Sequence, residues 1–231
     1  MPNAGDVISF SEMCAAEGVS LQRGMNFRTG GRTSIILMSL RKGAPYGDRI
    51  EDGGRVLIYE GHDIARTRDG PNPKDVDQPL TYPSGRLTQN GLFLEAARRF
   101  HVGKSPAEEV KVFEKIRSGI WVYNGLFRLV DAWQEDSLRR KVFKFKLELT
   151  DLSPSTRSIT TGALEHDRVI PSNVKLEVWK RDKGCCVKCG SKDNLHFDHI
   201  IPYSEGGTSK DARNIQLLCL RHNLEKRDTI Q

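Results

Sequence analysis

Four segments of the chain have the short apolar runs and β-branched composition that are typical of β-strands. They cover residues 34–40, 55–60, 119–133 and 141–149, in which Val, Ile, Leu and aromatic side chains predominate. Runs of this length, bounded by Gly, Pro, Asn or Ser, indicate strands with at least one buried face. The pattern therefore predicts a sheet-rich region in the first 150 residues.

Two segments between these strands have helical spacing instead. The clearer one covers residues 105–119, where Ser105 and Glu108 have the spacing of a capping box and apolar residues recur on one side. A second helix is expected over residues 88–100. Because strands flank a helical middle without regular alternation, the pattern favours an α+β fold with a largely antiparallel sheet or half-barrel.

A change in composition divides the chain into two parts. Residues 149–162 are dense in Ser, Thr, Gly and Pro and show no helical or strand period, which indicates a linker. Further on, Val174, Val178 and Trp179 recur at helical spacing, so a short helix should open the second part. The predicted division is a first domain over residues 1–150, a linker over 151–172 and a second domain over 173–231.

The overall composition is that of a globular protein with a modest positive charge. Lys and Arg number 36 against 30 Asp and Glu, which gives a formal net charge of +6. This charge permits a polyanionic partner without requiring one. No apolar run reaches the roughly 18 residues that a membrane span needs. The N-terminal residues also lack the basic start and apolar core of a signal peptide, so we expect a cytoplasmic protein.

Four of the five cysteines lie in the last part of the chain. Two residues separate Cys186 from Cys189, and two residues also separate Cys219 from His222. Two pairs with this spacing can close a loop around a tetrahedral zinc ion. A redox Cys-x-x-Cys pair or buried unpaired thiols are the alternatives, but neither explains the second pair. We therefore predict a structural Zn²⁺ site, with the other two cysteines in ordinary packing.

The order of features from residue 173 onward resembles the HNH nuclease family, whose fold is the ββα-metal fold. The features are Cys-x2-Cys, FDHIIP followed by two glycines, NIQLLC, and a final Cys-x2-His-Asn-x2-Lys. The second zinc pair ends in His222, where Cys is commoner. The resemblance covers residues 173–231 and implies a metal-dependent endonuclease that hydrolyses a phosphodiester bond.

The same resemblance suggests a role for each polar residue of this part. His199 would be the general base that takes a proton from water, a task that suits a neutral imidazole near pH 7. Asp198 and Asn223 would hold a catalytic Mg²⁺ or Mn²⁺ through oxygen. Asn214 would brace the loop that carries His199, and Lys226 would touch a phosphate. The alternative is that Asp198 and His199 are a surface pair beside a plain zinc ribbon.

The upstream part resembles SRA (YDG) domains, whose fold is a PUA-type β-barrel or crescent with flanking helices. The matching segments are APYGDRIEDGGRVLIYEGHD, DQPL, TQNGLFLEA and YNGLFRLVDAW, with Asn124 where the YDG motif has Asp. The similarity spans residues 24–150. It implies binding of double-stranded DNA in which a 5-methyl- or 5-hydroxymethylcytosine swings out of the duplex into a pocket.

By this resemblance, four residues would form the pocket for the modified base. Tyr46 and Tyr59 would sandwich the cytosine ring, which recovers about 1 to 3 kcal/mol of stacking per base. Asp48 would accept a hydrogen bond from the exocyclic amine, and Glu60 would line the space around the 5-substituent. The alternative is that both tyrosines are ordinary core residues of strands.

Taken together, the two resemblances predict a modification-dependent restriction endonuclease of bacterial type. Because one HNH centre ordinarily cuts one strand, a homodimer on DNA is expected. Two alternatives are an HNH endonuclease that acts on unmodified DNA and a binder of modified DNA without catalytic activity. The joint presence of Asp198, His199 and Asn223 argues against the second of these.

Overall fold

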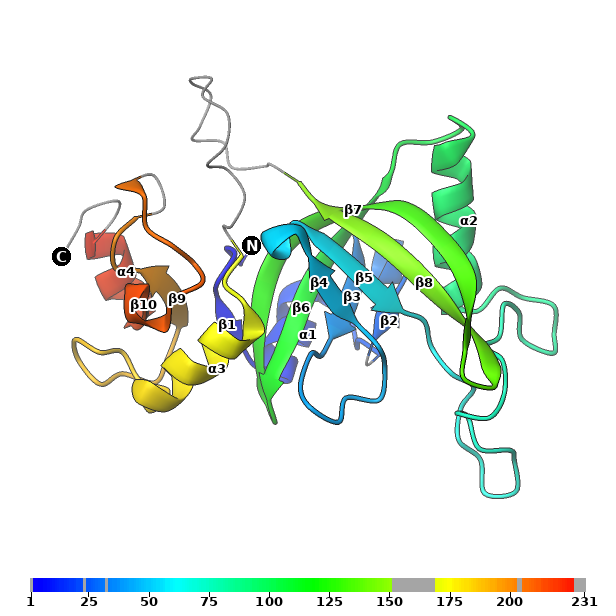
Figure 1. Ribbon diagram of the computed structural model, residues 1–231, viewed down its shortest axis with the longest axis horizontal. Helices are drawn as coiled ribbons and strands as arrows, with labels where there is room; N and C mark the ends of the chain where they lie inside the picture. Colours follow the sequence, from blue (N-terminus) through cyan, green and yellow to red (C-terminus); the bar gives the residue numbers. More distant parts are fainter. Residues whose placement is uncertain (1, 23, 32, 151–168, 203–204, 227–231) are drawn as a thin grey trace.

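The computed structural model describes the chain apart from residues 1, 23, 32, 151–168, 203–204 and 227–231. It has an α+β fold with one large sheet in the upstream part, residues 2–150, and a small hairpin in the downstream part, residues 169–226 (Figure 1). The predicted fold class is therefore confirmed. Most of the predicted linker, residues 151–172, lies outside the described residues.

The upstream part consists mainly of strands. Its strand order is β2-β3-β6-β7-β8-β5-β4, with β1 also paired to β7. The pairing of β3 with β6 is parallel, whereas the other strand pairings within the described residues are antiparallel. The elements are β1 (Val7–Ile8), α1 (Phe10–Glu17), β2 (Met25–Asn26), η1 (Thr29–Gly31), β3 (Ser34–Met38), β4 (Arg49–Glu51), η2 (Asp52–Gly54), β5 (Val56–Glu60), α2 (Gln89–His101), β6 (Glu108–Arg117), β7 (Ile120–Ser137) and β8 (Arg140–Leu149).

The four strands predicted from apolar runs are confirmed as β3, β5, β7 and β8, and the helix predicted over residues 88–100 is confirmed as α2. Thr88 caps α2, because its side chain accepts a hydrogen bond from the Gly91 backbone N–H. The buried side of α2 includes Phe93 and Leu94, which pack against the sheet.

The helix predicted over residues 105–119 is wrong, because this segment forms strand β6. Its apolar residues fit both a helical and a two-residue period, and pairing with β3 and β7 selects the strand. Val110 and Val112 then point into the core. Glu108 caps no helix, since its carboxylate accepts a hydrogen bond from the Ser34 hydroxyl at 2.7 Å.

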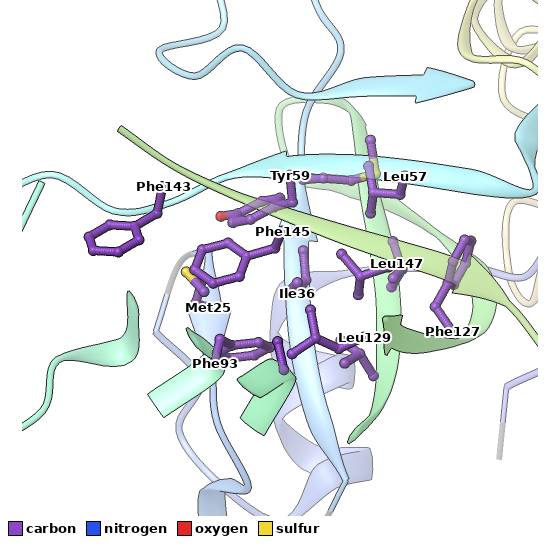
Figure 2. Packing of buried hydrophobic residues seen from close by; sticks show 14 of the residues in the cluster. Met25, Ile36, Leu57, Tyr59, Phe93, Phe127, Leu129, Phe143, Phe145 and Leu147 are labelled. Atoms are coloured by element: carbon purple, nitrogen blue, oxygen red, sulfur yellow. The ribbon is translucent and has the colours of Figure 1, made fainter. Parts of the chain in front are cut away.

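The main apolar core lies between α2 and one face of the large sheet (Figure 2). Aromatic rings fill much of it, with the centroids of Phe93 and Phe145 5.8 Å apart. Tyr59 lies among these side chains with 1% of its surface exposed. Because buried aromatic rings contribute large apolar areas to a core, this core helps to fix the positions of the strand ends described below.

The downstream part has the ββα order expected from the sequence. Strands β9 and β10 form an antiparallel hairpin, and α4 follows β10 directly. Its elements are α3 (Ser172–Arg181), β9 (Leu195–His199), η4 (Ala212–Asn214), β10 (Ile215–Cys219) and α4 (Leu220–Lys226). No helix among the described residues has the length and apolar character that crossing a membrane requires.

A second apolar cluster joins the two parts. Ile116 of β6 and Val122 of β7 pack in the same cluster as Val174 and Val178 of α3 and Leu217 of β10. All five side chains have at most 2% of their surface exposed. The hairpin is therefore packed against the large sheet through a shared core.

Candidate functional site

The four predicted zinc ligands converge at the end of the hairpin where Cys219 pairs with Leu195. Their donor atoms all lie within 4.8 Å of one another. The Nδ1 atom of His222 is 3.4 Å from the Cys186 sulfur and 3.3 Å from the Cys219 sulfur, and the sulfurs of Cys189 and Cys219 are 3.8 Å apart. Tetrahedral zinc places its ligand atoms about 3.5 to 3.8 Å apart. The donor set and its geometry therefore fit a zinc ion.

The turn that carries the first pair of cysteines favours the thiolate form of Cys186, whereas the neighbouring Cys186 and Cys219 sulfurs raise the pKa of Cys189. Backbone N–H groups of Cys219, Lys188 and Cys189 face the Cys186 sulfur and lower its pKa to about 6, although burial opposes this. A closed turn holds the loop, because the Gly190 N–H donates to the Cys186 carbonyl at 2.8 Å. Thiolate is the form that binds zinc, so the local backbone suits the ligand role.

Asp198 and His199 lie at the end of β9, opposite Gln216 and Ile215 of β10. The imidazole Nε2 of His199 lies 2.8 Å from the Ser209 hydroxyl, which fixes the orientation of the ring. Burial lowers the pKa of His199, and the nearby Asp198 carboxylate partly offsets this. The ring is therefore neutral at neutral pH, the form that can accept a proton. Ser209 carries no signal in the sequence that would have marked it.

Asn214 ties together the loop that follows His199. Its side-chain oxygen accepts a hydrogen bond from the Ile201 N–H at 2.8 Å, and its amide donates to the Thr208 carbonyl at 3.0 Å. Gly207 lies inside this arrangement, where a Cβ atom would come within 1.9 Å of the Ile201 carbonyl oxygen. This is the geometry that a bracing role requires, and the close approach explains the glycine.

The side chain of Lys226 is buried and contacts β9, so it is not exposed in the way that a phosphate contact requires. Its side chain is 1% exposed, and its ammonium lies 3.1 Å from the Asp198 carboxylate and donates to the His199 carbonyl at 2.6 Å. Asn223 lies three residues before it on the same side of α4 and is partly exposed. The helix thus reaches the Asp198 side of the hairpin, and Lys226 anchors it there.

In the upstream part, Tyr46 lies in the β3–β4 loop beside the end of β5. The ring that faces it belongs to His62, with centroids 6.1 Å apart and planes at 28°. Lys74 covers Tyr46 with its ammonium 4.2 Å from the ring centroid. His62 and Lys74 are not among the pocket residues predicted from the sequence, although His62 follows Tyr59 within the segment that resembles SRA domains.

Tyr59 and Asp48 lie behind this pair. The Tyr59 hydroxyl is 3.4 Å from the His62 Nε2 atom, which also accepts a hydrogen bond from the Met25 N–H at 2.9 Å. Asp48 accepts the Glu60 N–H at 3.0 Å. Burial raises the pKa of Asp48 to about 6 and lowers the pKa of His62 to about 4. The imidazole of His62 is therefore neutral, and Asp48 titrates near neutrality.

Glu60 is part of a network of buried charges beneath the loop. Its carboxylate lies 2.9 Å from the Lys144 ammonium and 3.2 Å from the Arg140 guanidinium, and it accepts the Gly47 N–H at 3.0 Å. Arg140 also pairs with Asp63. The structure thus gathers Tyr46, Asp48, Tyr59 and Glu60 at one end of β5, and their roles in base binding stay predictions.

A family model described as HNH endonuclease matches residues 186–229. This segment contains the whole Cys186, Cys189, Cys219 and His222 cluster, together with Asp198 and His199. The HNH module predicted for the downstream part is therefore confirmed.

Comparisons with whole proteins and solved structures involve most of the chain. It is 24% identical over 220 residues to the histone-lysine N-methyltransferase family member SUVH2 of Arabidopsis thaliana, covering 86% of this chain and 32% of SUVH2. The chain thus spans about a third of that relative's length. The crystal structure of the SUVH5 SRA domain in complex with fully methylated CG DNA is similar over 66% of this protein and 92% of the SUVH5 chain, with 23% sequence identity and a TM-score of 0.46. The same domain bound to fully hydroxymethylated CG DNA matches 69% and 94%, with 22% identity and a TM-score of 0.45.

Proposed function

We propose that this protein is a modification-dependent DNA endonuclease. The upstream part would read 5-methyl- or 5-hydroxymethylcytosine, and the downstream part would hydrolyse a phosphodiester bond. The observation that carries the proposal is the placement of Asp198 and His199 at the end of β9, on a hairpin whose opposite end carries the Cys3His cluster, within the segment that matches the HNH endonuclease model. The upstream motifs that resemble SRA domains supply the substrate class.

In this proposal, His199 accepts the proton of the attacking water, and Ser209 holds its ring in place. Asn214 keeps the loop beyond His199 closed around the hairpin. Asp198 and Asn223 offer the oxygen atoms for one divalent cation, Mg²⁺ or Mn²⁺, which when bound would neutralise charge on the phosphate. Zn²⁺ at the cysteine cluster would serve the fold alone.

The reading step would use the side chains gathered around the end of β5. Tyr46 offers a partly exposed ring for stacking, with His62 facing it. Asp48 offers a hydrogen-bond acceptor for the exocyclic amine of cytosine, since each carboxylate oxygen has a second lone pair beyond those used by backbone N–H groups. Cutting both strands would require two protomers on one duplex, so we extend the proposal to a homodimer on DNA.

The test is digestion of matched plasmids that carry unmodified, 5-methyl-, 5-hydroxymethyl- or glucosylated cytosine, with Mg²⁺ or Mn²⁺ added. We expect cleavage of one or more modified plasmids and little cleavage of the unmodified plasmid. Equal cleavage of all plasmids would instead identify an HNH nuclease that does not read modification.

Substitution of His199→Ala separates cutting from binding. We expect the variant to lose at least about a hundredfold in cleavage rate, the size of a general-base contribution, while it binds modified duplex as the unchanged protein does. Tight binding of modified DNA by the unchanged protein without cleavage under any metal would show a non-catalytic binder and overturn the nuclease assignment.

A further inference from the structure

Lys175 of α3 places its ammonium inside the upstream sheet. The Nζ atom lies 2.8 Å from the Glu114 carboxylate of β6 and donates to the Asn124 side-chain oxygen of β7 at 2.6 Å. The Asn124 amide in turn donates to the same Glu114 oxygen at 3.1 Å. These three side chains, the Lys175 cluster, are at most 3% exposed. The Lys175 ammonium and the Glu114 carboxylate pair with each other, and a protein interior tolerates buried charges only when they are paired in this way.

A β-bulge aims Asn124 at this cluster. Val112 pairs with Gly125 and Phe113 pairs with Tyr123, so Asn124 has no opposite residue on β6. The following Gly125 has a φ of +116°, a conformation that other residues rarely adopt. Bulges of this kind redirect a side chain out of the regular alternation of the strand.

The identity of residue 124 matches the lysine that docks there. An Asp at this position, as in the YDG motif, would place a second carboxylate against Glu114 and would remove the amide that now donates to it. One lysine would then face two buried negative charges, which is costly in a site that excludes water. Asn124 therefore suits a sheet on which Lys175 is docked.

The two parts are also joined by the segment before α1. Val7 of β1 pairs with Val122 of β7. On its other side, Phe197 of β9 donates its N–H to the Gly5 carbonyl at 3.1 Å. The same short segment thus hydrogen-bonds to the upstream sheet and to the hairpin that ends in His199, so the hairpin is held at two separate places.

The Lys175 cluster lies close to the proposed cutting centre. Asn124, Lys175 and His199 line one cavity of about 80 Å³ between the two parts, together with Gly5 and Phe197. A change in how α3 sits on the sheet would therefore move the strand that carries His199.

We propose that Lys175, Glu114 and Asn124 are positioning residues, which lock the cutting centre onto the reading sheet so that the cut falls at a fixed offset from the modified cytosine. This inference rests on the proposed function. It further states that docking, and not the length of residues 151–168, sets the offset.

The experiment maps cut positions at nucleotide resolution on an end-labelled duplex with a single modified cytosine, using the full chain. The unchanged protein should cut within a narrow window. Asn124→Asp should widen that window to several neighbouring phosphates, because it sets two carboxylates against each other. The double variant Glu114→Gln/Asn124→Asp exchanges the amide and the carboxylate, so it should restore the narrow window.

Two further variants guard against simple unfolding and test the role of chain length. Lys175→Met/Glu114→Gln removes both charges while keeping an amide beside Asn124, and it should fold but cut over the wider window. A Gly-Ser insertion within residues 151–168 should leave the window unchanged. A window that shifts with the insertion, or stays narrow in the folded Lys175→Met/Glu114→Gln variant, overturns the proposal.

A readout without DNA separates this inference from the proposed function. Hydrogen exchange of α3 and β9 amides should be at least tenfold faster in Asn124→Asp than in the unchanged protein, and the double exchange variant should slow it again. Unchanged exchange in Asn124→Asp would overturn the docking role even if cleavage occurs. Faster exchange with no cleavage by any form would support docking and reject the nuclease function alone.

Discussion

At the scale of single residues, burial changes the pKa of Asp48. The folded pKa of Asp48, about 6, lies above its ordinary value of 3.8 because burial disfavours the charge. The folded state therefore binds the proton more tightly than the unfolded chain, so the stability that Asp48 contributes is present at low pH and is lost as pH rises from about 4 to 6. The SRA resemblance predicts a base-binding role for Asp48, but its titration range depends on packing that no motif encodes.

If Asp48 accepts the cytosine amine, binding of modified duplex should strengthen roughly tenfold between pH 5 and pH 7, because an ionised acceptor makes the stronger hydrogen bond. His62 does not titrate in this range, since burial lowers its pKa to about 4. Fluorescence anisotropy at several pH values measures the trend. The affinity of the Asp48→Asn variant for modified duplex should not change with pH. A similar rise in affinity in that variant would assign the effect to another group.

Gly207→Ala should lower the free energy of unfolding by about 1 to 3 kcal/mol, the usual cost of forcing a group into a filled space. The added Cβ would meet the Ile201 carbonyl and the Asn214 amide, so the loop beyond His199 would open and cleavage should fall as well. Thermal unfolding and cleavage rate are the measurements. Gly206→Asn is the matched control, because a Cβ there has no atom within 4 Å and Asn tolerates its φ of +83°.

At the scale of elements, the apolar pattern predicted α2 and the strands β3, β5, β7 and β8, but it failed for β6 and did not identify α1 or the short strands β1, β2 and β4. For β6, the same valines fit two periods, and only the neighbouring strands decide between them. For α1, a signal was present: Ser9 and Glu12 form a capping box, and Gly18 ends the helix with a φ of +67°. Motif spacing was a better guide in the downstream part, where cysteine pairs specify a loop closure directly.

Cys189→Ala should abolish the folding contribution of zinc to the β9–β10 hairpin and α4, which in isolated zinc modules amounts to roughly 10 to 16 kcal/mol. We expect a chelator to lower the melting temperature of the unchanged protein and to have no further effect on Cys189→Ala. Cys185→Ala is the control, since Cys185 lies next to the cluster but is not one of its four members. Equal melting with and without chelator in the unchanged protein would argue against the zinc site.

At the scale of the whole molecule, the sequence predicts two parts but not how they meet. Lys175 and Glu114 form a buried ion pair where α3 packs on β6, yet the sequence around either residue contains no signal that predicts this pairing. Asn124 stood out only as a departure from a motif, and its reason lies in the docked lysine. Such pairings arise from tertiary packing, which single-sequence periodicity does not contain.

Gly5→Ala should loosen this junction. Gly5 has a φ of +98°, and a Cβ there would lie 2.9 Å from the Phe197 carbonyl oxygen. We expect faster hydrogen exchange in β9 and a lower melting temperature. Gly43→Ala shares the positive φ, at +80°, but has open space around it, so it isolates backbone strain from the lost contact. Equal effects of the two substitutions would mean that contact with Phe197 is unimportant.

The bond between His196 Nδ1 and Asp6 Oδ1, 2.5 Å long, joins residues 190 positions apart in the chain. Contacts between residues so far apart in the chain form slowly, because a long loop must close before the two side chains can meet. Each part can complete its own strands and helices first, and the union of the two comes last. We therefore expect the junction between the two parts to form last when the chain refolds, after the local strands and helices on either side of it.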